Sequence, residues 1–413
     1  MGAKAVKKAG MNAERLARIG DFLENAYVGP GRIAGCQVLV ARHGHVAYQR
    51  SLGSRNLAAG EPMTDDTVIR IYSMTKPIAS VALMTLWERG AFQLDDPIHK
   101  AFPEFRDQKV WVSGEGEAME TAPAQRPVTY RDVLTHTAGL TYGGLLEQVG
   151  APGSGDPVDA RYKELKIRRD PAETLEAFMG KLSQAPLKYQ PGERWMYSLA
   201  TDVVGALVER LSGRTLDRFL EEEIFAPLGM KETGFHVRPD QAERFAACYS
   251  RGEDKALKVV DDPGKSFYLA PPAFLSGGGG LVSTIGDYHR FCEMLRRGGE
   301  LDGVRILGSR TLDLMTENHL PGGVDLAELA IDSFSETMPK GVGFGLGFAM
   351  TVDGVRAGSP SEGDFYWGGA ASTIFWVDPY EDLVVIFMTQ LLPSTTYNFR
   401  GQLRNLVYAA IEE

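Results

Sequence analysis

The clearest strand patterns of this chain lie at its two ends, and helical patterns fill the region between them. Apolar runs near both ends predict five strands, at residues 36–41, 45–51, 344–350, 373–377 and 383–389. Amphipathic helices are predicted outside these strands, over 12–28 and 398–411. Strands form a sheet only side by side, so the two ends of the chain must meet in one layer. The pattern predicts an α/β domain that the middle of the chain interrupts.

The middle of the chain is typical of a helical insertion. Residues 201–211 place apolar side chains at helical spacing, and Gly213 follows as a helix-ending residue. We therefore expect residues 1–95 and 291–413 to form the sheet domain and residues 96–290 to form a mainly helical domain. A cleft between two such domains is a common location for a ligand site.

Charge and cysteine content narrow the functional classes. The chain has 44 Lys and Arg against 54 Asp and Glu, a net charge of −10, which argues against a nucleic-acid partner. No apolar stretch approaches the ~18 residues that a membrane span needs, and none follows the N-terminal lysines as in a signal peptide. Three widely separated cysteines form neither a disulfide framework nor a metal motif. We expect a soluble cytoplasmic protein with no metal, cofactor or membrane partner, as a monomer or a homo-oligomer.

A serine and a lysine stand one helical turn apart before an apolar run. Ser73-Met74-Thr75-Lys76 precedes residues 78–87, and Ser73 and Lys76 share one face if a helix begins there. A base beside a serine hydroxyl removes its proton and makes it nucleophilic, and the helix N-terminus adds positive charge where an oxyanion forms. The same residues also fit a capping serine followed by a solvated lysine.

A tyrosine before the central helix can complete such a site. Residues 190–198 predict a turn that delivers Tyr197 to the start of that helix. A lysine cation beside a phenol lowers its pKa, so Tyr197 could act as a base toward Ser73. A core tyrosine with a satisfied hydroxyl is the alternative interpretation.

Two glycines precede the predicted strand at 373–377. Gly368 and Gly369 allow the backbone to approach a ligand closely. The backbone N–H groups of Ala370 and Ser73 could then form an oxyanion hole. A simple turn is the alternative.

Two other motifs are interpreted as structural. No lysine follows the glycines at 277–280 to bind a phosphate, so we expect close backbone packing beside the cleft. His136 has no Gly-x-Ser-x-Gly motif to serve, so we expect a buried histidine held by hydrogen bonds.

The order of these segments resembles that of the three motifs of serine β-lactamases and penicillin-binding proteins: Ser73-Met74-Thr75-Lys76, Tyr197-Ser198-Leu199 and Trp367-Gly368-Gly369. From about residue 15 to its end the chain is most similar to the family VIII carboxylesterases, which resemble class C β-lactamases. Residues 134–140, 227–230 and 277–281 add to this resemblance. The resemblance implies a β-lactamase/transpeptidase-like α/β (α+β) fold, with an antiparallel sheet flanked by helices. It also implies that Ser73 is the nucleophile, Lys76 its proton partner and Tyr197 the base in acylation.

Two departures from the β-lactamase motifs bear on the substrate. Trp367 stands where those enzymes usually have the lysine of Lys-Thr-Gly, and Leu199 stands where they usually have Asn. A lost charge-assisted contact costs a carboxylate-bearing substrate about 1.5–3 kcal/mol, whereas a neutral ester loses nothing. We expect hydrolysis of neutral, short-acyl esters, with five residues contacting the substrate: Trp367, Gly368, Gly369, Leu199 and Tyr72. The alternatives are acyl transfer to an alcohol or amine, weak β-lactamase or D-amino-acid peptidase activity, and a catalytically silent binding module.

Overall fold

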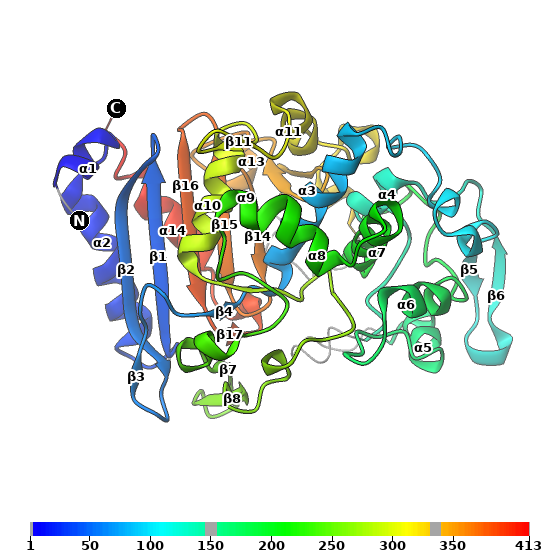
Figure 1. Ribbon diagram of the computed structural model, residues 1–413, viewed down its shortest axis with the longest axis horizontal. Helices are drawn as coiled ribbons and strands as arrows, with labels where there is room; N and C mark the ends of the chain where they lie inside the picture. The colour runs from blue at the N-terminus through cyan, green and yellow to red at the C-terminus, as the bar shows by residue number, and fades with distance from the viewer. Residues whose placement is uncertain (1–2, 145–154, 331–339, 413) are drawn as a thin grey trace.

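One antiparallel sheet joins the two ends of the chain. The computed structural model describes residues 3–144, 155–330 and 340–412, and within them the main sheet has eight strands in the order β12-β13-β14-β15-β16-β1-β2-β3. Their bounds are β1 Gly35–Arg42, β2 His45–Asn56, β3 Glu61–Pro62, β12 Val342–Phe344, β13 Ala349–Thr351, β14 Phe365–Gly369, β15 Thr373–Asp378 and β16 Leu383–Thr389. N-terminal β1 pairs with C-terminal β16 along its length, with Val38 opposite Phe387. The predicted meeting of the two ends is therefore confirmed (Figure 1).

Helices from both ends and from the middle of the chain cover the sheet. Helix α2 (Ala13–Leu23) begins after Asn12, whose side chain accepts the Arg15 N–H at 2.9 Å, and it packs against α14 (Phe399–Tyr408). Helix α10 (Ile285–Arg296) lies across the front of the sheet in Figure 1, where it contacts β15, β16 and β1. These contacts bury the apolar stripes that predicted the terminal helices.

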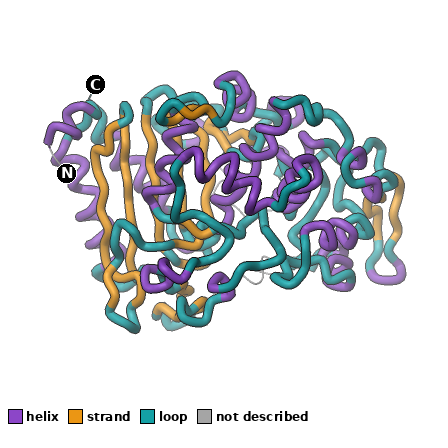
Figure 2. The backbone as a smooth tube through the Cα atoms, in the orientation of Figure 1, coloured by secondary structure: helices purple, strands orange, loops and turns teal. Residues whose placement is uncertain are grey.

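The middle of the chain is mainly helical. Helix α3 (Thr75–Glu88) precedes this region, whose helices are α4 Tyr130–Leu134, α5 Pro157–Glu164, α6 Leu175–Leu182, α7 Ala200–Ser212, α8 Leu216–Leu220 and α9 Ala226–Leu228. Helix α7 matches the prediction for 201–211, and Gly213 ends it with φ +68°. Helices α3 and α7 pack against each other at the centre of the molecule (Figure 2). In the described part of the chain no helix is long and apolar enough to cross a bilayer.

The remaining helices and strands are short. They are α1 Ala3–Lys8, α11 Ser309–Thr316, α12 Leu326–Leu329, α13 Gly354–Ala357, β4 Ile69–Arg70, β5 Lys109–Ser113, β6 Glu120–Pro123, β7 Cys248–Arg251, β8 Leu257–Asp261, β9 Val282–Ser283, β10 Glu300–Leu301, β11 Val304–Arg305 and β17 Leu391–Leu392. Strand β4 pairs with β9, and β7 pairs with β17 from the C-terminal part. Helix α10 crosses the predicted boundary at residue 291, and the division into domains stays a prediction.

The single strand predicted at 344–350 is wrong. The structure has a hairpin there, in which β12 and β13 pair antiparallel and Phe344 lies opposite Ala349. Gly347 reverses the chain with φ +97°, and a Cβ at this position would lie 2.3 Å from Ser80 Oγ of α3. Contact with α3 therefore decides the turn, and the apolar composition of the segment does not reveal it.

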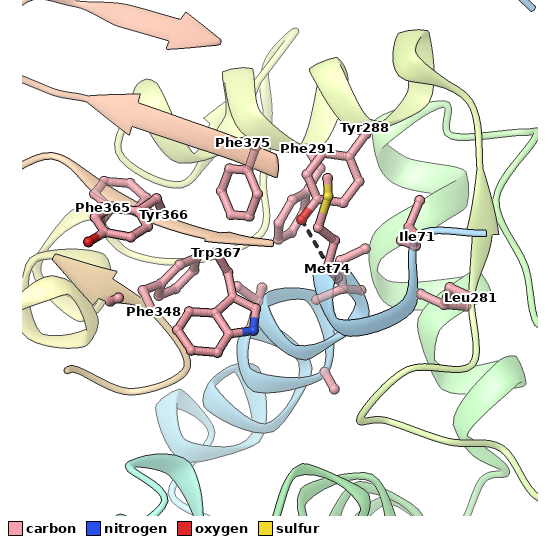
Figure 3. Close-up of a cluster of buried hydrophobic side chains, with 14 of the residues drawn as sticks. Ile71, Met74, Leu281, Tyr288, Phe291, Phe348, Phe365, Tyr366, Trp367 and Phe375 are labelled. Atoms are coloured by element: carbon pink, nitrogen blue, oxygen red, sulfur yellow. Dashed lines mark hydrogen bonds between the residues drawn. The ribbon is translucent and has the colours of Figure 1, made fainter. Parts of the chain in front are cut away.

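The segment 365–370 is more regular than predicted. Residues Phe365–Gly369 form β14, which pairs with β15 so that Gly368 lies opposite Ile374 and Gly369 opposite Thr373. Ala370 lies in the turn that joins β14 to β15, so the choice between an oxyanion-hole donor and a simple turn stays open. Figure 3 shows aromatic side chains of β14, β15 and α10 around Met74, which links this strand to the start of α3.

Candidate active site

Ser73 lies in a short 3₁₀ turn, Tyr72–Met74, directly before α3. The sequence predicts that the helix opens at Ser73, and the structure begins it at Thr75. The serine side chain is half-buried, whereas the residues that follow it in α3 are buried. The turn therefore presents the hydroxyl at the edge of a packed helix.

Packing on both sides fixes the turn. The N–H of Ile71 donates to Leu281 O at 3.1 Å, and Tyr288 Oη donates to Met74 O at 3.0 Å (Figure 3). Tyr72 adopts φ +42°, a left-handed conformation that is uncommon for a non-glycine residue. Such a conformation persists only where the surrounding structure holds it. These contacts therefore set the direction of the Ser73 side chain.

The Lys76 amine lies against Ser73. Its Nζ is 3.0 Å from Ser73 Oγ and donates to Gly278 O at 2.6 Å, and the residue is only 2% exposed. Burial lowers the pKa of Lys76 well below its usual value, and the charge of Arg169 adds to this effect while that of Asp202 opposes it. An uncharged amine has a lone pair that can accept the serine proton. The structure thus brings together the two residues predicted from helical spacing.

Tyr197 approaches this pair from the loop before α7. Its phenol forms hydrogen bonds with Ser73 and Tyr142, and it accepts the Trp367 Nε1–H at 3.3 Å. The Lys76 Nζ lies 4.6 Å from the centre of the Tyr197 ring. The three predicted catalytic side chains therefore lie within contact of one another.

The charge state of Tyr197 differs from the prediction. Burial raises the pKa of Tyr197 above its ordinary value, although its hydrogen bonds act in the opposite direction. The expectation that Lys76 lowers the pKa of this phenol is therefore wrong. Burial of the phenol itself is the largest cause, and burial also makes the Lys76 amine lose its proton more readily than a free lysine. The site therefore holds a readily deprotonated amine beside a phenol that keeps its proton at neutral pH.

Strand β14 brings the third motif against the nucleophile turn. A Cβ at Gly369 would lie 2.4 Å from Ile71 O, so a side chain at this position would push the strand away. Among the described residues, the backbone N–H groups of Ser73 and Ala370 donate to no other protein group. Both donors are therefore available to an oxyanion.

The remaining predicted substrate contacts differ in accessibility. Trp367 is 4% exposed and uses its indole N–H on Tyr197, and Leu199 is fully buried at the start of α7. Tyr72 is half-buried, and its hydroxyl forms a hydrogen bond with the Cys248 thiol. Substrate contact by these residues stays a prediction, and Tyr72 is the most accessible of the three.

Sequence analysis missed an ion pair beside Lys76, between a half-buried arginine and a buried aspartate. Arg169 Nε and Nη2 lie 3.0 and 2.9 Å from Asp202 Oδ2, and Asp202 is fully buried. An aspartate in the first turn of α7, directly before an apolar run at 203–208, is a signal that could have been noticed. Arg169 lies in the loop between α5 and α6, where no local pattern marks it.

The two motifs interpreted as structural have structural contacts. His136 Nδ1 lies 3.2 Å from Ser198 Oγ and Nε2 lies 3.4 Å from Thr201 Oγ1, and burial holds the pKa of this histidine well below its usual value. A Cβ at Gly277 would lie 2.6 Å from Thr201 O, in agreement with the expected close packing. Residues 3–144, 155–330 and 340–412 contain no group of three or more His, Cys, Asp and Glu that could hold a metal ion.

Comparison with known proteins identifies the family and the fold of this chain. The Beta-lactamase family model matches residues 21–409. Esterase EstB of Burkholderia gladioli is 32% identical over 405 residues, which cover 92% of this chain and 91% of EstB. The structure of EstCE1, described as a hydrolase with promiscuous acyltransferase activity, is 27% identical with a TM-score of 0.77, over 97% of this chain and 99% of its own. The LovD9 mutant of simvastatin synthase from Aspergillus terreus is 25% identical with a TM-score of 0.78, over 96% and 98%. These matches confirm the predicted β-lactamase/transpeptidase-like fold.

Proposed function

The chain belongs to the beta-lactamase family, among relatives of esterase EstB and the family VIII carboxylesterases, and we propose that it hydrolyses carboxylic esters through an acyl-enzyme on Ser73. The observation that carries this proposal is the 3.0 Å separation of Ser73 Oγ and the buried Lys76 Nζ. A serine hydroxyl attacks an ester only when a base takes its proton, and a lysine amine without charge is such a base.

In acylation, Ser73 Oγ attacks the ester carbonyl carbon while its proton moves to Lys76 Nζ. We assign the backbone N–H groups of Ser73 and Ala370 to the oxyanion that forms. When the ester C–O bond breaks, the leaving alkoxide takes the proton of Tyr197, whose raised pKa keeps this phenol protonated. The Lys76 ammonium then returns a proton to the Tyr197 phenolate, so both groups end the step neutral.

Deacylation uses Lys76 as the base and then as the acid. A water molecule attacks the acyl carbonyl and gives one proton to Lys76, and the bond between the acyl carbon and Ser73 Oγ breaks. The Lys76 ammonium then protonates Ser73 Oγ, which restores the free enzyme. The family resemblance gives the role of base in acylation to Tyr197. The pKa directions instead favour Lys76 as the base and Tyr197 as the acid.

Neutral esters are the proposed substrates, with small acyl groups preferred. The third motif contributes an indole at Trp367 in place of a lysine, and this indole donates to Tyr197. The nearby Arg169 guanidinium directs two of its nitrogens to Asp202. Neither group supports strong binding of a substrate carboxylate.

The test uses hydrolysis of p-nitrophenyl acetate and butyrate by purified protein. We expect a burst of p-nitrophenol followed by steady turnover, and no turnover in Ser73→Ala. Ser80→Ala is the matched control, because Ser80 lies in α3 with a buried hydroxyl that has no hydrogen-bond partner among the described residues. Full activity in Ser73→Ala would refute the proposal, and so would failure of a fluorophosphonate to label Ser73, which favours a silent binding module.

Acyl transfer to an alcohol or amine is the second candidate. It is favoured by the likeness to simvastatin synthase and to EstCE1. Both reactions share the Ser73 acyl-enzyme and diverge only when water or an acceptor attacks it. Added short alcohols should divert the acyl group to a new ester if transfer is the main reaction, and the partition of products measures it.

A further inference from the structure

The ion pair of Arg169 and Asp202 lies beside the proposed base and has no role in the steps above. Each carboxylate oxygen of Asp202 has a separate set of partners. The Oδ2 atom accepts from Arg169 Nε and Nη2 at 3.0 and 2.9 Å. The Oδ1 atom accepts from Ser276 Oγ at 2.6 Å and from the N–H of Gly278 at 3.1 Å. The carboxylate is therefore fully bonded while completely buried.

A single residue, Gly278, connects this pair to the lysine through its backbone. The N–H of Gly278 donates to Asp202, and its carbonyl oxygen accepts from Lys76 Nζ at 2.6 Å. A Cβ at Gly278 would lie 2.3 Å from Arg169 Nη2 and 3.0 Å from Asp202 Oδ2. Glycine is therefore needed for the pair to reach this backbone. The position of the amine depends on Asp202 through a single residue.

The positive charge of Arg169 also offsets the negative charge of Asp202. A carboxylate without a partner near Lys76 would attract an ammonium and keep the proton on the amine. The guanidinium of Arg169 acts in the opposite direction, and the two charges oppose each other in setting the pKa of Lys76. Asp202 can thus hold the Gly278 peptide without charging the lysine.

The other groups around Lys76 carry no charge at neutral pH. The rings of Tyr197 and Tyr142 lie 4.6 and 5.7 Å from Nζ, and burial raises the pKa of both phenols. Burial lowers the pKa of His136 well below its usual value. Among the described residues, the ion pair therefore supplies the charges that act on the amine.

We propose that Arg169 and Asp202 are positioning residues that hold the Lys76 amine against Ser73 and, by balancing each other's charge, leave that amine free to accept the serine proton. This inference rests on the proposed function, because it concerns the base of that reaction. It goes beyond that function because it assigns Arg169 and Asp202 opposite effects on the protonation of Lys76, although neither residue is proposed to touch the substrate.

The experiment is the pH profile of kcat/KM for p-nitrophenyl acetate in four variants and the unaltered protein. Activity rises with pH as Lys76 loses its proton, which gives an acidic limb. Arg169→Gln leaves the Asp202 carboxylate unbalanced and should move this limb to higher pH by about one unit, so activity falls about tenfold on the limb and recovers at alkaline pH. Asp202→Asn leaves the Arg169 cation unbalanced and should move the limb to lower pH.

Two controls separate charge from packing. Arg169→Lys keeps the positive charge and should leave the limb near its original pH. The double variant Arg169→Gln with Asp202→Asn removes both charges and should return the limb toward that of the unaltered protein. If Asp202→Asn does not fold, the comparison of Arg169→Gln with Arg169→Lys still tests the role of charge, because only Arg169→Gln removes the positive charge.

A uniform loss of activity at every pH, with no movement of the limb in Arg169→Gln, would overturn the inference and leave the pair a purely structural role. Labelling of Ser73 by a fluorophosphonate, measured by intact mass, separates this failure from failure of the proposed function. If Ser73 is labelled and the acidic limb of the pH profile does not move, only the proposed role of Arg169 and Asp202 is refuted. No labelling refutes the acyl-enzyme, and the inference falls with it.

Discussion

Replacement of Tyr197 by Phe removes one hydroxyl and keeps the ring that packs the site. This hydroxyl accepts the Trp367 Nε1–H at 3.3 Å, and Trp367 is 4% exposed, so little water can replace it. A buried donor left without an acceptor costs about 1–3 kcal/mol, and we expect the free energy of unfolding to fall by that amount. Turnover should fall at least about a hundredfold, because general acid catalysis typically contributes about 10²–10⁴. This loss of stability follows from the hydrogen bond between Trp367 and Tyr197, which the sequence did not reveal.

A double-mutant cycle separates the two effects of this substitution. Trp367→Phe removes the donor, so Tyr197→Phe in that background strands no N–H group. The double variant should therefore cost about 1 kcal/mol less stability than the two single variants together, whereas its turnover stays low. Urea unfolding measures stability, and p-nitrophenyl butyrate hydrolysis measures turnover. Near-normal turnover in Tyr197→Phe would remove this residue from the mechanism, and strictly additive stabilities would refute the hydrogen-bond argument.

Two further substitutions test the third motif. Trp367→Lys should raise kcat/KM for a carboxylate-bearing ester relative to a neutral one by about tenfold or more, because a charge-assisted contact contributes about 1.5–3 kcal/mol. An unchanged ratio would contradict the assignment of neutral substrates. Gly369→Ala should destabilise the protein by about 1–3 kcal/mol and slow acylation, since its Cβ would lie 2.4 Å from Ile71 O. Gly180→Ala in α6, where a Cβ meets nothing within 4 Å, should instead stabilise by about 0.5–1 kcal/mol in the same urea assay, and equal stabilities would refute the steric argument.

Local periodicity predicted those elements whose burial is regular. Strand β1 is buried along its whole length and α7 is buried from Ala200 to Val208, so both appear in the sequence as mainly apolar segments. The hairpin of β12 and β13 has the same apolar composition as one continuous strand. Its turn depends on the contact of Gly347 with Ser80, which lies far away in the sequence. A tertiary contact of this kind has no local signal.

The residues of the candidate site were predictable where helical spacing or the order of known motifs marked them. Ser73 and Lys76 are three residues apart, and helical geometry alone brings them together. Tyr197 and the third motif followed from their order in a family pattern. The charge state of Tyr197 could not be predicted, because it depends on how deeply the folded chain buries this phenol. Arg169 reaches Asp202 from a loop, so its role is visible only in three dimensions.

The exchange of a lysine for Trp367 links the substrate to the catalytic groups. A cation at the third motif would favour the phenolate of Tyr197, which is the form that a tyrosine base requires. The indole donates one hydrogen bond to this phenol but carries no charge, and Arg169 is balanced by Asp202. We therefore propose that the proton stays on Tyr197 and that Lys76 takes the role of base. The proposed preference for neutral esters has the same origin, because the nearby Arg169 cation is already paired with Asp202 and the third motif contributes an indole in place of a lysine.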